Sequence, residues 1–416
     1  MRTIETAAKA LTVTTDSGEW EWMSHQTAAF DRWIELTGLY GGSDLNMLAK
    51  MLVFYPTGKG KTEIMLTCMY LVDVKRVVVV APPVTHARWR RVGHALGIQV
   101  DTISHAKYRM KDTAFYSTDP IIVDEFHLLG KQTGAGWKKF DAHMRKIKAP
   151  AIIGSATPEY NEAERVYCVM HALDAPNNKG GFIGWLYEHC ITEQNPFGKM
   201  PVVVRLRNFA SAEEMLASLP YAVYVPDEAP DISTPVLMPA WESEDFEEWN
   251  LDHSKKRVMA SQMEKKHRQT FHNIIDPDSG EMRFEVATKL LELLDKHRDK
   301  PVLVYLVHSE IAKLVYAELK AVYELNVTYI DGDTPSGLKD KLLDEFVAGQ
   351  WDILVGTATL ATGRDGIDKV SDAIIILDDT DDNAHRRQLI GRVLPRGVVK
   401  PADYVGKVAY RFVFTA

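Results

Sequence analysis

The sequence has little cysteine: its 416 residues include only Cys68, Cys168 and Cys190, at no metal-ligand spacing and in a number that cannot pair evenly. We therefore expect a reducing, cytoplasmic environment, the host cytoplasm if a phage encodes the chain. The sequence also lacks a run of about 18 apolar residues, which excludes a membrane-spanning helix, and it lacks the apolar stretch of a secretory signal. Basic residues are outnumbered, 49 against 57 acidic. A surface that binds polyanions everywhere is therefore excluded, but a local basic groove is not.

Short β-branched runs alternate with longer helical patterns from residue 50 to 155 and again after residue 300. This alternation predicts an α/β fold with two mostly parallel sheets, each carrying helices on both faces. The expected strands are Met51–Tyr55, Arg76–Ala81, Ile121–Asp124, Ala151–Ser155, Val302–Leu306, Val327–Ile330, Ile353–Val355 and Ala373–Leu377.

The composition changes between these two regions. From Asn208 to Ser254 there is no Lys or Arg, acidic residues are frequent, and prolines interrupt the pattern. We expect the chain to cross from one domain to the next here, giving domains 1–232 and 233–416. The acidic stretch is either a solvated surface or a docking site, and its pattern identifies no protein partner.

Residues 55–62, Tyr-Pro-Thr-Gly-Lys-Gly-Lys-Thr, follow an expected strand and open an expected helix. In that context a glycine-rich loop turns backbone N–H groups toward a polyphosphate. Lys61 would reach the β- and γ-phosphates, and the Thr62 hydroxyl would join the Mg²⁺ shell. Tyr55 stands where Gly or Ala is usual, and a Gly-Lys-Thr tripeptide alone can be an ordinary helix start. The predicted nucleotide-binding residues of this loop are Gly58, Lys59, Gly60, Lys61 and Thr62.

Residues 121–127, Ile-Ile-Val-Asp-Glu-Phe-His, form an expected apolar strand that ends in two adjacent carboxylates. Open α/β sheets bind ligands at the carboxyl ends of their strands. Asp124 would hold the metal ion through water, and Glu125 would polarise the attacking water, as phosphoryl transfer to water requires. Two acids at a strand end can also be a simple turn. Together with the phosphate loop, they predict an NTP-hydrolysing site that uses ATP and Mg²⁺.

The order of these segments resembles that of superfamily 2 helicases and translocases. The segments that look like motifs Q, I, II, III, V and VI are, in chain order, Gln26, 58–62, 124–127, 155–158, 356–368 and 388–392. Residues 23–26 followed by Trp33, and residues 81–83 followed by Trp89, look like the corresponding segments of the Swi/Snf-type (DExH-box) branch. The chain is similar to the compact phage and bacterial forms of that branch.

This resemblance implies two tandem RecA-like domains with an ATP site divided between them. It implies that Gln26 reads the adenine, Asp365 contacts the ribose and Gln388 contacts the γ-phosphate or the first domain. It also implies that His127 couples the hydrolysis site to motif III or motif VI, although a histidine there can simply cap a strand end.

Arg392 is the expected arginine finger, which would stabilise charge on the transferring phosphoryl group. Relatives carry a second arginine three residues later, where this chain has Pro395 and then Arg396. Either Arg396 serves as the second finger or only one finger works. The alternative to a catalytic role is a basic surface facing the acidic stretch, for Arg392 and Arg396 as well as for Arg386 and Arg387.

Translocation requires both domains to hold a phosphate backbone, with contacts that are salt-sensitive and blind to base sequence. The expected contacts are Pro83, Thr85, His86, Ser104, Lys107 and Thr357. Base stacking by Trp89 or Trp137 is the lesser alternative to core packing.

We therefore expect a nucleic-acid-stimulated ATP hydrolase that moves along double-stranded DNA without a separate wedge domain. One alternative is a strand-separating or branch-migrating DNA helicase. A different class is a nucleotide-sensing DNA-binding module with little turnover, suggested by Tyr55 and Pro395. DNA is the expected partner, and RNA stays open because backbone contacts do not reveal the sugar.

Overall fold

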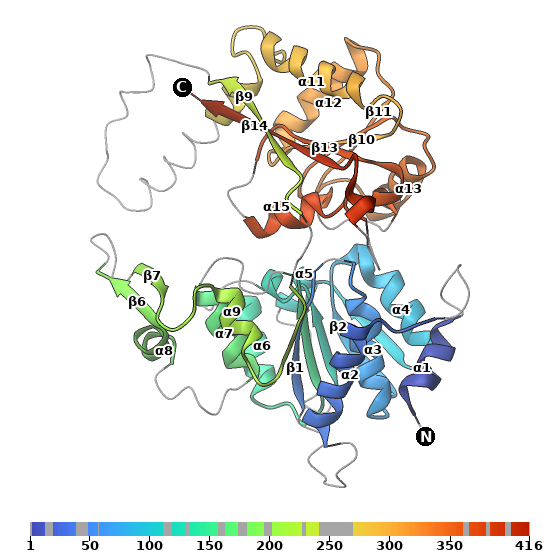
Figure 1. The fold of residues 1–416 in the computed structure, drawn as a ribbon, viewed down its shortest axis with the longest axis vertical. Helices are drawn as coiled ribbons and strands as arrows, with labels where there is room; N and C mark the ends of the chain where they lie inside the picture. The colour runs from blue at the N-terminus through green and yellow to red at the C-terminus, as the bar shows by residue number, and fades with distance from the viewer. Residues whose placement is uncertain are drawn as a thin grey trace. The chain divides into compact units, whose positions relative to one another are not determined.

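The structure is a computed structural model that divides into two compact units, Met1–Glu228 and Ala229–Ala416. We call them unit 1 and unit 2 and describe each by itself (Figure 1). The described residues are 2–12, 20–38, 49–56, 58–110, 119–129, 134–156, 163–173, 181–194, 202–226, 230–240, 269–360, 366–379, 383–395 and 401–415.

The core of unit 1 is a six-stranded sheet in the order β3-β2-β4-β5-β1-β8, and every pairing in it is parallel. Its strands are β1 (Lys50–Phe54), β2 (Arg76–Val80), β3 (Gln99–Ile103), β4 (Ile121–Asp124), β5 (Ala151–Ser155) and β8 (Ala222–Tyr224). Because the strands are parallel, all their carboxyl ends meet at one edge of the sheet.

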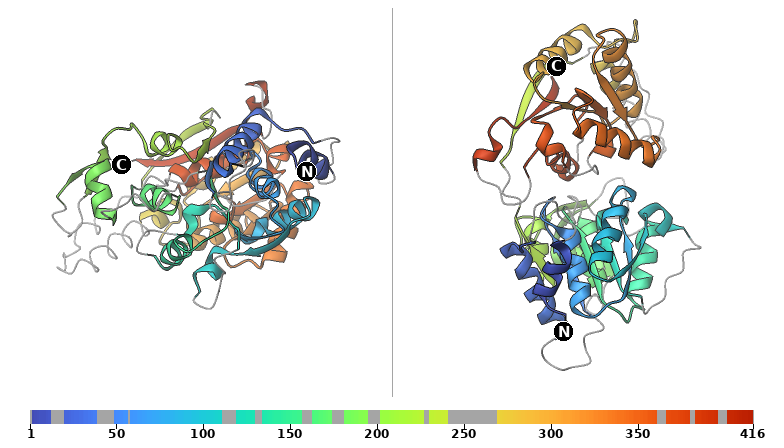
Figure 2. Two further views of the ribbon diagram at one scale, coloured as in Figure 1. Left: turned by 90° about the horizontal axis from the view of Figure 1, so that it is seen from below. Right: turned by 90° about the vertical axis from the view of Figure 1, so that its right-hand side faces the viewer.

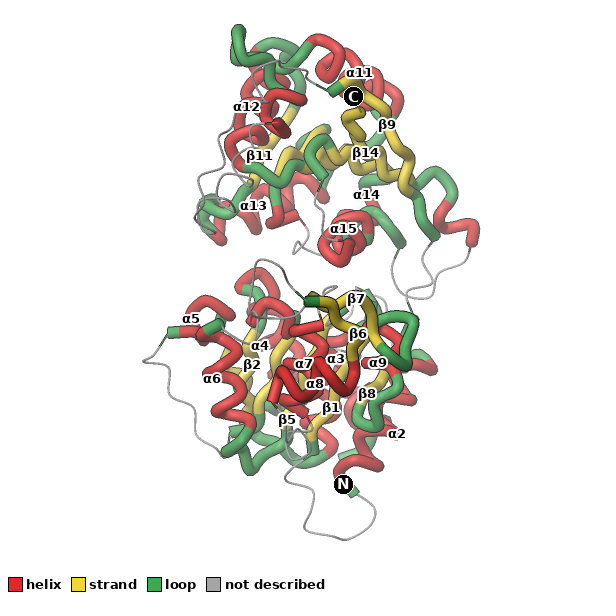
Figure 3. The backbone as a smooth tube through the Cα atoms, turned by 90° about the vertical axis from the view of Figure 1, so that its left-hand side faces the viewer, coloured by secondary structure: helices red, strands yellow, loops and turns green. Residues whose placement is uncertain are grey.

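Helices cover both faces of this sheet because alternate strand residues point to opposite sides. On one face Met51 and Val53 pack with α1 (Ile4–Leu11), α2 (Ser24–Thr37), α3 (Lys61–Leu71) and α4 (His86–Ala95). On the other face Leu52 and Val123 pack with α6 (Ala135–Met144), α7 (Ala163–Leu173), α8 (Gly181–His189) and α9 (Ala212–Ala217). Figure 3 shows the yellow strands with red helices on both sides.

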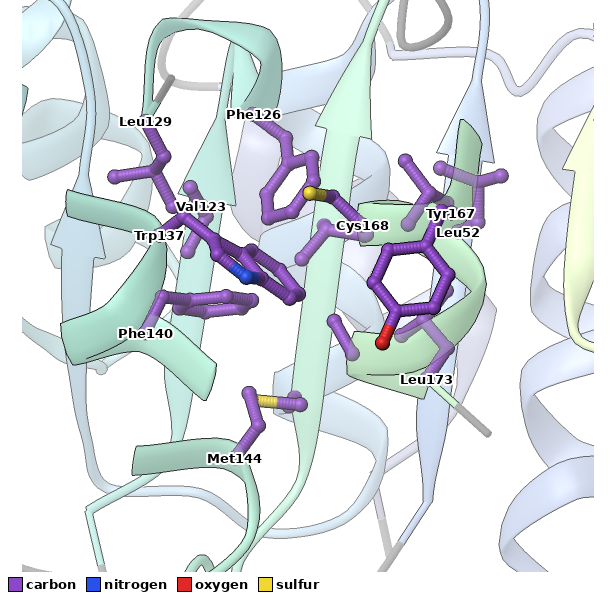
Figure 4. Close-up of a cluster of buried hydrophobic side chains, with 14 of the residues drawn as sticks. Leu52, Val123, Phe126, Leu129, Trp137, Phe140, Met144, Tyr167, Cys168 and Leu173 are labelled. Carbon is purple, nitrogen blue, oxygen red and sulfur yellow. The ribbon is translucent and has the colours of Figure 1, made fainter. Parts of the chain in front are cut away.

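Aromatic side chains fill much of the second face. Figure 4 shows Phe126, Trp137 and Phe140 gathered beside Val123, with Tyr167 and Cys168 of α7 farther along the sheet. The rings of Phe126 and Phe140 lie 5.2 Å apart between centroids, in an edge-on arrangement. Beyond this layer, β6 (Cys190–Glu193) and β7 (Val202–Leu206) form a separate antiparallel pair.

Unit 2 repeats the plan with the strand order β11-β12-β10-β13-β14-β9, again with parallel pairing throughout. Its strands are β9 (Ser233–Pro239), β10 (Val302–Tyr305), β11 (Val327–Ile330), β12 (Ile353–Gly356), β13 (Ala373–Ile376) and β14 (Val408–Thr415). One face packs against α11 (Phe284–Lys296) and α12 (Ser309–Ala321), and the other against α13 (Ser336–Val347), α14 (Ile367–Val370) and α15 (Asn383–Ile390). Figure 2 shows both units from two further sides.

These two sheets confirm the predicted α/β architecture of two mostly parallel sheets with helices on both faces. The eight strands expected from the sequence are all present, within one residue at each end. One difference is β9, a strand that contains Pro235 within the stretch where prolines were expected to break regular structure. It lies at the edge of the sheet, where a missing N–H leaves no neighbouring strand without a donor. None of the described helices is long and apolar enough to cross a membrane.

Candidate functional site

The predicted ATP-binding and acidic residues of unit 1 lie at the carboxyl edge of its sheet. The phosphate loop follows β1, Asp124 ends β4 and Glu125 follows it, and β5 lies between the two strands. Phe54 pairs in register with Ser155, and Asp124 pairs with Gly154, so the three strands end at the same level. Two strand spacings put the loop and the acid pair about 10 Å apart.

The phosphate loop depends on two glycines in the left-handed region of backbone space. Gly58 has φ 83° and Gly60 has φ 77°, values that other residues adopt only with strain. A Cβ on Gly60 would also lie 2.3 Å from Nε2 of Gln26. Helix α3 begins directly after Gly60, at Lys61, so its free N–H groups open toward this loop. The loop is therefore built for close approach of a ligand to backbone.

Gln26 is buried against this loop, at 1% exposure. Its Oε1 accepts from the backbone N–H of Met23 at 3.0 Å, and its Nε2 donates to the carbonyl of Lys59 at 3.5 Å. The side chain thus joins the start of α2 to the phosphate loop.

Tyr55 makes a second tie between the same segments. Its hydroxyl donates to the backbone carbonyl of His25 at 2.5 Å, and burial raises the pKa of the phenol. The ammonium of Lys61 donates to the carbonyls of Tyr55 at 3.0 Å and Pro56 at 3.4 Å. The residue that departs from the usual glycine-rich pattern therefore fixes the loop to the Gln26 segment.

The acid pair is strained and poorly solvated. Asp124 is 7% exposed, and burial, reinforced by the charge of Glu125, raises its pKa to about 7, while Lys61 opposes that shift. Glu125 has φ 49°, and its N–H donates to Oδ1 of Asp124 at 3.0 Å. Left-handed backbone at a non-glycine residue costs on the order of 1–3 kcal/mol and is concentrated at functional sites. A cation beside these carboxylates would relieve their repulsion.

His127 and Ser155 connect this pair to the end of β5. Nδ1 of His127 lies 2.9 Å from the Ser155 hydroxyl and 3.4 Å from Oε2 of Glu125. The Ser155 hydroxyl donates to the same Glu125 oxygen at 3.3 Å. The histidine of the acidic segment is therefore in contact with the segment that looks like motif III.

Two further contacts of this site did not follow from the sequence. His105 in α5 (His105–Arg109) lies with Nε2 2.8 Å from the Asp124 carbonyl oxygen, and burial lowers its pKa to about 4. Arg88 of α4 donates from Nη2 to Oε1 of the buried Glu63 of α3 at 2.9 Å. Glu63 directly follows the Lys61-Thr62 pair, which is the signal that could have marked it. For His105 the sequence holds no such signal, because its partner is a backbone carbonyl.

The expected nucleic-acid contacts of unit 1 follow β2 and β3, at the same edge of the sheet. Pro83 and Lys107 are exposed, and Thr85, His86 and Ser104 are half-buried. By contrast Trp89 and Trp137 are buried, at 0% and 3% exposure, so the alternative of base stacking by these tryptophans is wrong. They are core residues.

In unit 2 the predicted residues Gln388, Arg392 and Thr357 are all buried, at 9%, 7% and 5% exposure. Helix α15 ends at Ile390, so Arg392 lies in the turn that precedes Pro395.

Arg386 is held within unit 2. Its Nε donates to both carboxylate oxygens of Asp379, at 2.9 and 3.0 Å, and Nη2 of Arg411 donates to the same group at 2.7 Å. This contact favours a structural role for Arg386. Asp365 and Arg396, predicted to contact the ribose and to serve as a second finger, lie outside the described residues.

The residues present fit a Mg²⁺-nucleotide. Gly58 and Gly60 adopt left-handed backbone without strain, and α3 presents its N-terminus to the loop. Thr62 offers a hydroxyl and Asp124 a carboxylate, the oxygen ligands that Mg²⁺ prefers when phosphates complete its shell.

Comparison with known proteins agrees with this fold. Residues 282–397, within unit 2, match the family model described as the helicase conserved C-terminal domain. S. cerevisiae Dbp5 bound to RNA and ADP BeF3 is similar at a TM-score of 0.57 and 15% identity, over 99% of this chain and 88% of that chain. A single-residue variant of Dbp5 in the same complex gives a TM-score of 0.56 with equal identity and coverage. These likenesses show the two-domain α/β fold.

A Sulfolobus solfataricus SWI2/SNF2 ATPase core in complex with dsDNA is similar at a TM-score of 0.40 and 12% identity, over 94% of this chain and 88% of that chain. That similarity is too low to support an argument. No curated protein sequence matches the chain at a significant level.

Proposed function

We propose that the chain is an ATP-dependent DNA translocase of superfamily 2, of the Swi/Snf type, in which nucleic acid stimulates ATP hydrolysis. The observation that carries this proposal is the pairing, at one sheet edge, of a left-handed glycine loop with two adjacent acids, the buried Asp124 and Glu125 with its left-handed backbone. The helicase C-terminal domain in residues 282–397 supports it, because hydrolysis drives movement only when a second domain responds to the nucleotide.

In this proposal unit 1 binds the nucleotide through Gly58, Lys59 and Gly60, with Lys61 on the β- and γ-phosphates. Thr62 and Asp124 hold Mg²⁺, which would neutralise charge on the phosphates. Glu125 orients the attacking water, and its Ser155 and His127 contacts limit how its carboxylate can turn.

Unit 2 supplies the groups that complete the site when the two units close. Arg392 stabilises charge on the transferring phosphoryl group, and Gln388 contacts the γ-phosphate. Asp365 is proposed to contact the ribose and Arg396 to act as a second finger. A buried arginine in a turn is preorganised for such a role, since it loses little side-chain freedom on closing.

Nucleic acid is proposed to lie along the loops that contain Pro83, Thr85, His86, Ser104 and Lys107, with Thr357 contributing from unit 2. Contacts of this kind read the backbone, so double-stranded DNA is the proposed track on the Swi/Snf-type resemblance alone. RNA is the alternative substrate, and Dbp5 bound to RNA shares the fold.

The test is phosphate release measured with no nucleic acid and with duplex DNA, single-stranded DNA, forked DNA and RNA. We expect duplex DNA to give the largest stimulation and added salt to reduce it. Lys61→Ala should lower the rate of ATP hydrolysis on the order of 10³-fold, because it removes the ammonium group that would stabilise negative charge on the transferring phosphates. A Lys61→Ala protein with wild-type turnover would contradict the proposal.

Strand separation is the second candidate function. The antiparallel pair β6 and β7 stands outside both parallel sheets, and Val204 on it is 52% exposed, which suits an element that meets an unpaired base. A labelled fork and a triplex-displacement substrate distinguish the two activities. Release of a strand from the fork indicates a helicase, and release of only the third strand indicates a translocase. Phosphate release that no nucleic acid raises would instead favour a nucleotide-sensing module.

A further inference from the structure

Helix α5 contacts the turn of the acid pair on one side and exposes Lys107 on another. His105 and Arg109 are four residues apart and therefore share one face of the helix. His105 contacts the carbonyl of Asp124 at 2.8 Å, and Nη2 of Arg109 donates to the carbonyl of Leu128. Both carbonyls belong to the turn that carries the acid pair. Lys107 lies between the two anchors in sequence and is exposed.

The His105 contact falls on the peptide that aims Glu125. A carbonyl oxygen can only accept, so Nε2 of His105 carries the hydrogen and donates it. The N–H of the same peptide donates to Oδ1 of Asp124 at 3.0 Å. Both ends of the Asp124–Glu125 peptide are thus held, next to a residue whose φ is 49°. Without the His105 bond the carbonyl end of this peptide loses that hydrogen bond, and rotation toward an unstrained conformation becomes easier.

We propose that His105 is a positioning residue that transmits nucleic-acid binding at Lys107 to Glu125. A backbone phosphate on the outer side of α5 would fix the helix, and His105 would then fix the peptide that points the Glu125 carboxylate at water. This inference rests on the proposed function, and it deepens it by assigning the stimulation of hydrolysis to one hydrogen bond. It predicts that basal and stimulated turnover depend differently on His105.

Three variants isolate this hydrogen bond. His105→Leu fills the site without a donor, and His105→Gln places an amide N–H near the position of Nε2. His94→Leu, on the exposed end of α4, controls for loss of a histidine from the same unit. Each is assayed for kcat with and without duplex DNA, for the Kd of ATP and for the Kd of DNA, after a thermal melt shows that it is folded.

We expect His105→Leu to lower DNA-stimulated kcat by about 10- to 100-fold, with both dissociation constants within about twofold of wild type. Basal kcat should fall much less, so that the stimulation ratio collapses. His105→Gln should restore most of that ratio, and His94→Leu should match wild type. A His105→Leu enzyme that keeps the wild-type ratio overturns the inference while the proposed function stands.

A measurement on the wild-type chain does not depend on any variant folding. Hydrogen exchange in peptides that cover residues 121–129 should slow when saturating duplex DNA is added, because α5 then holds the Asp124 and Leu128 carbonyls more firmly. Unchanged exchange there, in a protein whose ATPase is stimulated, also overturns the inference. A wild-type enzyme that no nucleic acid stimulates overturns the proposed function and this inference together.

Discussion

The two sheets place an aspartate at the same kind of position and treat its charge in opposite ways. Asp124 is the last residue of β4 in unit 1, and its pKa is raised to about 7 by burial and by Glu125. Asp331 follows β11 in unit 2. Burial raises its pKa as well, but hydrogen bonds from Thr334, Tyr329 and Lys313 outweigh that and lower it to about 2. Its Oδ1 accepts from the N–H groups of Asp333 and Thr334 at 3.0 and 2.9 Å.

Asp378, after β13, is like Asp331 in accepting hydrogen bonds from backbone N–H groups. One of its oxygens accepts from the N–H groups of Val307 and His308 at 3.1 and 3.2 Å. The fold alone therefore does not make a strand-end carboxylate functional. A carboxylate whose charge hydrogen bonds already compensate holds loops together, whereas one whose charge is compensated only in part, as that of Asp124 is, can take a cation.

Arg392 is the proposed exception, a unit 2 charge that serves unit 1. Arg392→Ala should lower DNA-stimulated ATP turnover on the order of 10³-fold with little change in ATP binding. Arg386→Ala is the matched control. It should cost unit 2 about 1 kcal/mol of stability through its Asp379 bonds and leave turnover near wild type. Equal turnover in both variants would show that Arg392, like Arg386, has a structural role and not a catalytic one.

Glu125→Gln tests the partly compensated side of the comparison. The amide cannot serve as a base, so turnover should fall about 100-fold while ATP binding, measured with a fluorescent analogue, is retained. Removing one of two repelling carboxylates should also make unit 1 no less stable. Wild-type turnover would show that Glu125 does not position water.

Asp331→Asn tests the compensated side. The lowering of the pKa of Asp331 from the ordinary aspartate value of about 3.9 to about 2 corresponds to about 2 kcal/mol of stability in unit 2. Because the folded pKa lies below the unfolded one, this contribution is complete above about pH 4 and is lost as the pH falls through about 2. Urea unfolding of unit 2 can be monitored by hydrogen-exchange labelling. The difference in free energy of unfolding between the wild type and Asp331→Asn should shrink below about pH 4. ATP binding by unit 1 should be unaffected.

Gly60→Ala and Gly97→Ala distinguish the effect of backbone strain from the effect of a clash with Gln26. Both glycines have positive φ, 77° and 67°, but a Cβ meets Gln26 at 2.3 Å in the first and nothing within 4 Å in the second. Both variants should lose about 1 kcal/mol of stability. Only Gly60→Ala should weaken ATP binding, by about tenfold, because it displaces the loop. Equal ATP affinity in the two variants would mean that the Gln26 contact does not shape the site.

The sequence predicted eight strands of the two parallel sheets, most of them continuous apolar runs buried on both faces. It did not predict the edge strands β3, β8 and β9 or the interior strand β14, which are short or mix polar residues or proline with apolar ones. The phosphate loop and the acid pair could be found because their chemistry depends on side chains at short, fixed spacing.

The rest of the site depends on long-range contacts to backbone. His105 meets a carbonyl 19 residues away, and Tyr55 meets one 30 residues away, and a carbonyl has no residue identity. The strain at Glu125 is equally hidden, since any residue type can be forced into that conformation by its surroundings. Arg386 was open between two roles until Asp379 and Arg411 were found beside it.

The chain enters unit 2 through β9, whose sheet partner β14 comes from residues 408–415. A pull on the backbone where the chain enters unit 2 would therefore load the ladder between these strands first, from Ser233 opposite Ala409 to Pro239 opposite Thr415. When parallel strands are pulled along their length, the load is shared by all the hydrogen bonds between them at once, and these bonds do not break one after another. In the proposed motor, the strand through which the chain enters unit 2 would thus be anchored by residues 408–415.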